Sequence, residues 1–85
     1  MNMKKVLIYP LTTEKAIKMI EIENKIVFVV DRKASKAEIA KAAKDNFGAK
    51  VKKVNVQIRD NKKIAFIELG PESPAIDIAT KLGLI

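Results

Sequence analysis

The alternation of hydrophobic and polar residues divides this 85-residue chain into short strands and helices. An apolar run at residues 6–9 is stopped by Pro10, which cannot donate to a β-ladder, so we expect a brief edge strand there. Residues 26–30 are five consecutive apolar residues, rich in β-branched types. A strand that is apolar on both sides is covered on both faces, which predicts helices above and below the sheet.

Two segments early in the chain have the apolar spacing of amphipathic helices. The first is capped by Thr12 or Thr13 and runs to about Ile22, before a turn signal at residues 24–25. The second spans residues 35–47 and ends at Gly48, with Ser35 and Glu38 placed to form a capping box. The predicted inward residues are Ala16, Ile17 and Ile20 in the first helix and Ile39, Ala40, Ala43 and Phe47 in the second.

The second half of the chain predicts a hairpin and a last helix. Residues 51–59 alternate strictly, and Asp60-Asn61 is a turn signal before the apolar run at 64–69. Ser73 is the predicted N-cap of the last helix, with Pro74 at its first position and Gly83 at its end. The predicted core-facing residues are Val54, Val56 and Ile58 in the strand and Ala75, Ile76, Ala79 and Leu82 in the helix.

The resulting order is β-α-β-α-β-β-α, without repeats. It predicts an α+β fold, with a small, mainly antiparallel sheet covered by helices and a C-terminal basic hairpin. The length fits one domain, residues 1–85.

Charge is distributed unevenly over these elements. Residues 32–63 contain eleven Lys or Arg and three acids, so they carry +8, whereas the remainder has six basic and seven acidic residues and carries −1. The hairpin segment 50–63 alone has six cations against one acid. Lysines on an edge strand also prevent aggregation, but they usually come singly. This density predicts contact with RNA or DNA instead.

The aromatic residues refine that prediction. Phe28 and Phe66 stand among apolar neighbours, which predicts core packing rather than a platform on which bases stack. Asn55 and Gln57 share the polar side of the strand and can hydrogen-bond sugars or base edges. We therefore expect recognition of the shape and phosphates of folded RNA, not sequence-specific recognition of single strands.

Several functional classes are disfavoured by residues that the chain lacks. There is no His and no Cys, no glycine-rich phosphate loop and no spaced set of acidic metal ligands. We expect no enzyme, no metal, no cofactor and no small-molecule substrate. No apolar run approaches the ~20 residues of a membrane helix or the core of a signal peptide, so we expect a cytoplasmic protein without a membrane partner.

The stretch at residues 9–16, YPLTTEKA, has two interpretations. Glu14 in the first turn of a helix complements the helix dipole without any partner. Alternatively, the hydroxyls of Thr12 and Thr13 and the free N–H groups meet a phosphate. The chemistry of these residues does not decide between the two.

Four blocks in order resemble the universal large-subunit ribosomal protein family numbered twenty-three. They are residues 9–16, residues 27–31 with Ala34, Lys36, Glu38 and Ile39, residues 47–48 with 51–55, and residues 62–65. The compact length and residues 79–84 are similar to the archaeal form. Val56 and Asp60-Asn61 depart from the pattern, since many members have Thr after the strand Asn and a longer hairpin with Gly at its tip.

The resemblance implies a structural protein that binds large-subunit ribosomal RNA (rRNA) beside the exit of the nascent-chain tunnel. It also implies contact with a neighbouring small helical ribosomal protein and a docking platform for the signal recognition particle or a chaperone, with Glu14 as a factor contact. The alternative is a non-ribosomal protein-interaction module or small hydrolase on a similar sheet. The predicted RNA contacts are Lys4, Lys5, Thr12, Thr13, Lys15, Arg32, Lys33, Lys36, Lys50, Lys52, Lys53, Asn55, Gln57, Arg59, Lys62 and Lys63.

Overall fold

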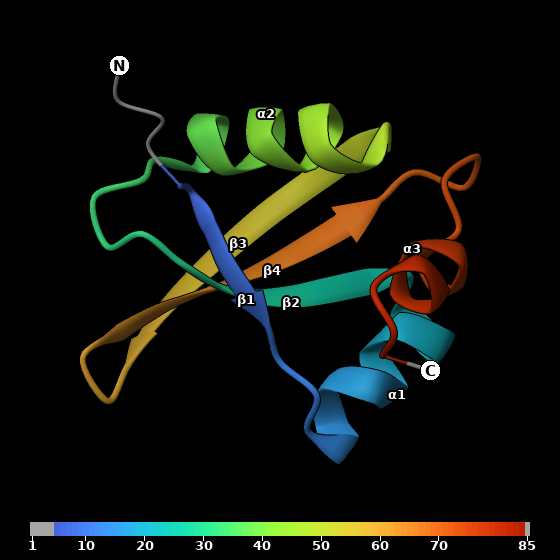
Figure 1. Cartoon of the computed structure of the whole chain (residues 1–85), viewed down its shortest axis with the longest axis horizontal. Coiled ribbons are helices and arrows are strands. Elements are labelled where there is room, and N and C mark those ends of the chain that lie inside the picture. Colours follow the sequence, from blue (N-terminus) through green and yellow to red (C-terminus); the bar gives the residue numbers. More distant parts are fainter. Residues whose placement is uncertain (1–4, 85) are drawn as a thin grey trace.

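The computed structural model describes residues 5–84 and confirms the predicted order of elements (Figure 1). The elements are β1 (Leu7–Pro10), α1 (Glu14–Glu23), β2 (Lys25–Val30), α2 (Lys36–Phe47), β3 (Val51–Arg59), β4 (Lys62–Leu69) and α3 (Ala75–Lys81). The α+β class is therefore correct. Lys25, which we placed in a turn, is already the first residue of β2.

The four strands form one antiparallel sheet in the order β1-β2-β4-β3. The strands β2 and β3 run parallel to each other, and α2 connects them while β4 is inserted between them. This arrangement makes β1 an edge strand, as Pro10 predicted. It also puts β3, the most highly charged strand, on the opposite edge.

The two faces of the sheet are covered by different helices. Ile39 and Ala43 of α2 pack in a cluster with Phe28 and Ala65, and we call this side the α2 face. On the other side, Ala16 of α1 packs with Val27 and Ile64, and we call that side the α1 face. All residues from Ile26 to Val30 are buried, so the prediction that this strand is covered on both faces is confirmed.

The helix ends follow the local sequence signals. The Thr13 hydroxyl accepts a hydrogen bond from the N–H of Ala16, which identifies Thr13 as the cap of α1. Ser35 and Glu38 form the predicted capping box, and Gly48 ends α2 with a φ of 65°. These signals act over three or four residues, which is why the sequence predicts them well.

Three apolar residues that we predicted for the core lie at the surface. Ile58 is 59% exposed because it stands near the hairpin tip, in a part of β3 where Val56 is already only partly buried. In α3, Ile76 and Leu82 are exposed, at 39% and 37%. This helix of seven residues buries only one stripe, formed by Ala75, Ile78 and Ala79.

The N-terminus of α3 also differs from the prediction. Pro74 is at the N-cap and makes no side-chain bond, whereas Ser73 accepts a hydrogen bond from the N–H of Lys50. The first N–H of the helix, that of Ala75, donates to the side-chain oxygen of Asn24 at 2.6 Å. A residue at the far end of α1 therefore replaces the expected cap.

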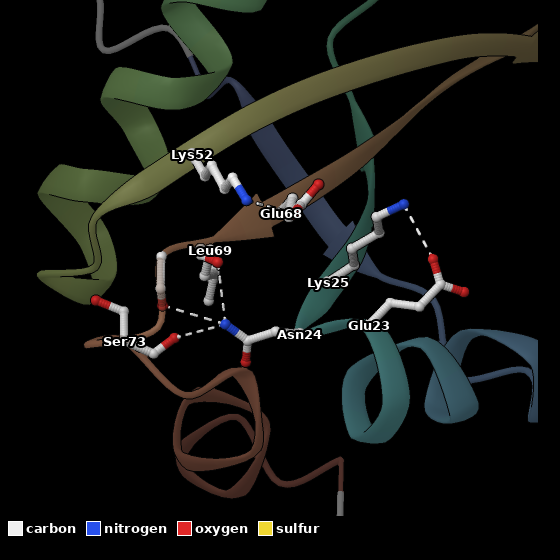
Figure 2. Close-up of polar contacts among 8 residues, drawn as sticks. Glu23, Asn24, Lys25, Lys52, Glu68, Leu69 and Ser73 are labelled. Carbon is white, nitrogen blue, oxygen red and sulfur yellow. Dashed lines mark hydrogen bonds and ion pairs between the residues drawn. The ribbon is translucent and has the colours of Figure 1, made fainter.

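Asn24 also joins α1 to the end of the sheet. Its Nδ2 donates to the carbonyls of Leu69, Gly70 and Ser73 at 3.0, 3.2 and 3.3 Å, and Figure 2 shows the amide at the junction. Its backbone caps α1 at a φ of 54° and accepts a hydrogen bond from the N–H of Leu69 at 3.0 Å. One side chain thus fixes α1, β4 and α3 relative to one another.

Replacing Asn24 with Ala is therefore expected to lower the free energy of unfolding by about 2–4 kcal/mol, because several partly buried groups lose their partner. Urea denaturation followed by circular dichroism measures the loss. Asn24→Gly tolerates the positive φ but lacks the amide, so it should remain destabilised. Asn61→Gly is the matched control at another position of positive φ, and it should leave stability unchanged. If Asn24→Gly were as stable as the wild type, the stability lost in Asn24→Ala would come from backbone strain and not from the missing amide.

Candidate nucleic-acid interface

The hairpin between β3 and β4 closes through a two-residue turn. Asp60 and Asn61 have φ values of 53° and 64°, which is the type I′ geometry that matches the twist of paired strands. Asp and Asn tolerate this left-handed region better than most residues do. The turn sets Arg59 directly opposite Lys62 and fixes the register of the whole hairpin.

That register decides which polar side chains share a face. Asn55 pairs with Phe66, and Gln57 pairs with Ile64, so both lie on the α1 face. By the same alternation, Lys53, Arg59 and Lys62 lie on this face, and all five polar residues are exposed. We call the set Lys53, Asn55, Gln57, Arg59 and Lys62 the hairpin patch. The predicted polar, positively charged side of β3 is present, and Lys62 joins it.

The two cations next to the turn lie opposite each other, and like charges at such a cross-strand pair destabilise a hairpin. Each is held by a neutral neighbour. The Arg59 guanidinium donates to the Gln57 side-chain oxygen at 2.8 Å. The Lys62 ammonium donates to the Tyr9 hydroxyl at 3.1 Å and lies 5.8 Å from the centre of the Tyr9 ring. An anion bound between the two cations would relieve their repulsion.

The hydrogen bond to the Tyr9 hydroxyl raises the pKa of Lys62, with a smaller contribution from the charge of Asp60. Because the pKa of a lysine is already far above neutral, Lys62 carries its full charge at physiological pH. The side chain is solvent-exposed, so this charge is available to a ligand.

Several predicted contacts lie away from the patch or are already paired. Lys50 lies 3.7 Å from Glu72, and Lys52 lies 3.6 Å from Glu68, the pair drawn in Figure 2. Lys63 points to the α2 face, where its ammonium donates to the carbonyl of Ala34 at 2.6 Å. These three side chains have partners within the protein, whereas Lys53 is exposed and has no ion-pair or hydrogen-bond partner among residues 5–84.

Other predicted cations are spread around the molecule. Arg32 and Lys33 follow the end of β2 that pairs with Lys63, so they lie at the same end of the sheet as the hairpin tip. Lys36 begins α2 and Lys5 precedes β1, and neither belongs to the patch. Lys4 lies outside the described residues. The concentrated charge of residues 32–63 is therefore divided between both sides of the sheet.

The start of α1 borders the patch. Thr13 and Lys15 line a small hollow together with Arg59, so the segment at residues 9–16 and the hairpin meet on the α1 face. Thr12 and Glu14 are exposed beside them. Glu14 stands in the first turn of α1, where it complements the helix dipole, and its carboxylate lies 3.9 Å from Lys18.

Sequence reasoning did not identify two aromatic residues at this interface. Tyr9 is 41% exposed and lies in the edge strand β1. It contacts Lys62 of β4, which is 53 positions away in the sequence. Phe66 packs against the second hydrophobic cluster, but its side chain is only half-buried. The alternation around Phe66 indicates that it shares the polar side of the hairpin, since Phe66 lies opposite the polar residue Asn55.

The sequence of the chain matches a family model described as ribosomal protein L23, over residues 5–74. The match covers most of the chain and includes every element except α3. The chain belongs to the ribosomal protein L23 family. Ribosomal proteins L23 are structural components of the large ribosomal subunit and have no enzymatic role, and the predicted resemblance is thereby confirmed.

Two further features are absent from the described part of this L23 protein. Within residues 5–84, no group of three or more His, Cys, Asp or Glu residues is placed to hold a metal ion. No helix in that range is long and apolar enough to cross a membrane. The hairpin patch remains the best-defined candidate site.

The opposite orientations of Lys62 and Lys63 give a test of the register. Lys63→Met keeps the aliphatic stem but leaves the carbonyl of Ala34 without its donor, so unfolding should become easier by about 1–2 kcal/mol. Lys62→Met removes the same charge from the exposed α1 face and should cause no comparable loss. Thermal and urea unfolding of the two variants measure the difference. Equal destabilisation would contradict the assigned faces.

Proposed function

We propose that this L23 protein binds large-subunit rRNA through the hairpin patch. The observation that carries the proposal is the placement of Lys53, Arg59 and Lys62 with Asn55 and Gln57 on one exposed face. Phosphate contacts need long cationic side chains on a rigid base, and the paired strands β3 and β4 provide that base. The amides of Asn55 and Gln57 are suited to sugar hydroxyls and base edges.

The distribution of the acidic residues supports this orientation. Glu21 and Glu23 stand at the end of α1, while Glu72 and Asp77 lie in the connection to α3 and in α3 itself. These elements meet around Asn24, at the opposite end of the sheet from the hairpin turn (Figure 1). Glu23 and Glu72 pair there with Lys25 and Lys50, so that end offers little free positive charge, and a polyanion would approach the end with the turn.

The remaining parts of the role rest on family resemblance. We propose a position beside the exit of the nascent-chain tunnel, in the cytoplasm, in contact with a small helical ribosomal protein. We also propose a docking platform for the signal recognition particle or a chaperone, with Glu14 as a contact. Its side chain is 87% exposed, and its one ion-pair partner among residues 5–84 is Lys18 at 3.9 Å, so a protein factor could reach it.

The alternative function, a protein-interaction module or small hydrolase, has no specific observation in its favour. Hydrolases most often use a His base or a Cys nucleophile, and the sequence contains neither residue type. Co-sedimentation separates the alternatives, because an rRNA-bound component should remain on large subunits during a high-salt wash. An adaptor or enzyme should be released.

The triple variant Lys53→Gln, Arg59→Gln, Lys62→Gln should weaken binding to purified large-subunit rRNA and reduce its salt dependence. Each lost phosphate contact lowers the slope of log K against log salt by about 0.7–0.9, so the slope should fall by about 2–3 in total. Filter binding at four or more salt concentrations measures both effects.

A variant with the same loss of charge is the control for general electrostatics. Lys41→Gln, Lys44→Gln, Lys81→Gln removes three exposed cations from the helices α2 and α3. Its salt slope should stay close to that of the wild type. A fall of the same size in both variants would refute the assignment of the hairpin patch, because it would show that only net charge matters.

A further inference from the structure

We propose that the α1 face also binds one unpaired nucleobase of the RNA, stacked on Phe66. This inference rests on the proposed function, because the RNA backbone must first be held by the hairpin patch. It adds a stacked base to the contacts with phosphates, sugars and base edges that the hairpin patch provides.

The site is a hollow of about 50 Å³ between α1 and the hairpin. Its floor is apolar and includes Phe66, Ile64 and Met19. Its rim carries Lys15 of α1, Thr13 at the N-cap of that helix and Arg59 from the end of β3. An aromatic floor with a cationic rim fits a flat, apolar ring joined to a phosphate, which is the chemistry of a nucleotide.

The exposure of Phe66 supports this assignment. The three other aromatic residues of the chain differ in their surroundings. Phe28 is buried on the α2 face, and Phe47 packs against it with ring centres 5.7 Å apart. Tyr9 is exposed, but the Lys62 ammonium already lies over its ring. Phe66 is half-buried within the hollow, so part of its side chain remains accessible.

The size of the hollow limits the ligand to a single base. A volume of about 50 Å³ holds only a few waters, so a base stacks at the opening and is not enclosed. Asn55 stands directly opposite Phe66, and its amide has no hydrogen-bond partner within the described part of the chain. That amide can pair with the edge of the stacked base.

The test uses two RNA stem-loops that differ at one position. The first has a single bulged adenosine in its stem, and the second has an abasic residue there, so both carry the same phosphates. Wild-type protein should bind the adenosine form about 5- to 150-fold more tightly, which is the range expected for one base stacked on an aromatic ring. Fluorescence anisotropy of end-labelled RNA measures both affinities.

Phe66→Leu keeps an apolar side chain but removes the ring. It should bind both RNAs with the affinity that the wild type has for the abasic form. Phe47→Leu is the matched control, since Phe47 is also half-buried but lies in α2 against the other face. This control should retain the preference for adenosine. Circular dichroism verifies that both variants fold.

The outcomes separate this inference from the proposed function. Equal, salt-dependent binding of both RNAs by the wild type would overturn the base site and leave the phosphate interface intact. A preference for adenosine that persists in Phe66→Leu would also overturn it, because the base would then stack elsewhere. Failure to bind either RNA would overturn the proposed function, and the base site with it.

Discussion

The structure depends on one amide, that of Asn24, because it joins elements that have few other contacts with each other. A four-stranded sheet with its two helix-covered faces needs something to hold α1 and α3 in place at the end of the sheet. Asn24 does this with one donor group and one acceptor group, which together reach Leu69, Gly70, Ser73 and Ala75. A small domain buries little surface, so such polar connections contribute a large share of its net stability.

The position of α1 in turn determines the candidate interface. Because α1 covers only part of its face, the polar side of β3 stays open, and the start of the helix comes next to the hairpin. The segment at residues 9–16 and the hairpin are far apart in sequence, but they border the same hollow. The helix α1 therefore contributes both to the junction at one end of the sheet and to the candidate surface at the other.

The parts of the fold that the sequence predicts are those that local signals determine. Ser35 and Glu38 recognise each other across three residues, and the alternation in residues 51–59 assigns Asn55 and Gln57 to one side without any tertiary information. The cap of α3 was predicted wrongly because its acceptor, Asn24, lies 51 positions away. No pattern in a single sequence reports a contact of that kind.

In the candidate site, too, local signals were predictable from the sequence and long-range contacts were not. Six cations in the hairpin segment were predicted to act together, but alternation puts the neighbours Lys62 and Lys63 on opposite sides, and the strand pairing shows that only Lys62 lies on the α1 face. Ile58 fits a core pattern by its spacing, yet it is exposed because the hairpin extends beyond the region that α2 covers. The alternation of side chains between the two faces of a strand follows from neighbouring residues. The length of strand that a helix covers depends on the tertiary fold.

Tyr9 gives the interface a built-in optical probe. It is the sole tyrosine of a chain without tryptophan, so its phenol dominates emission excited near 280 nm. That phenol hydrogen-bonds the ammonium of Lys62 in the hairpin patch. A change in the surroundings of this one pair alters the intrinsic fluorescence of the whole protein, which makes occupancy of the surface observable without any attached dye.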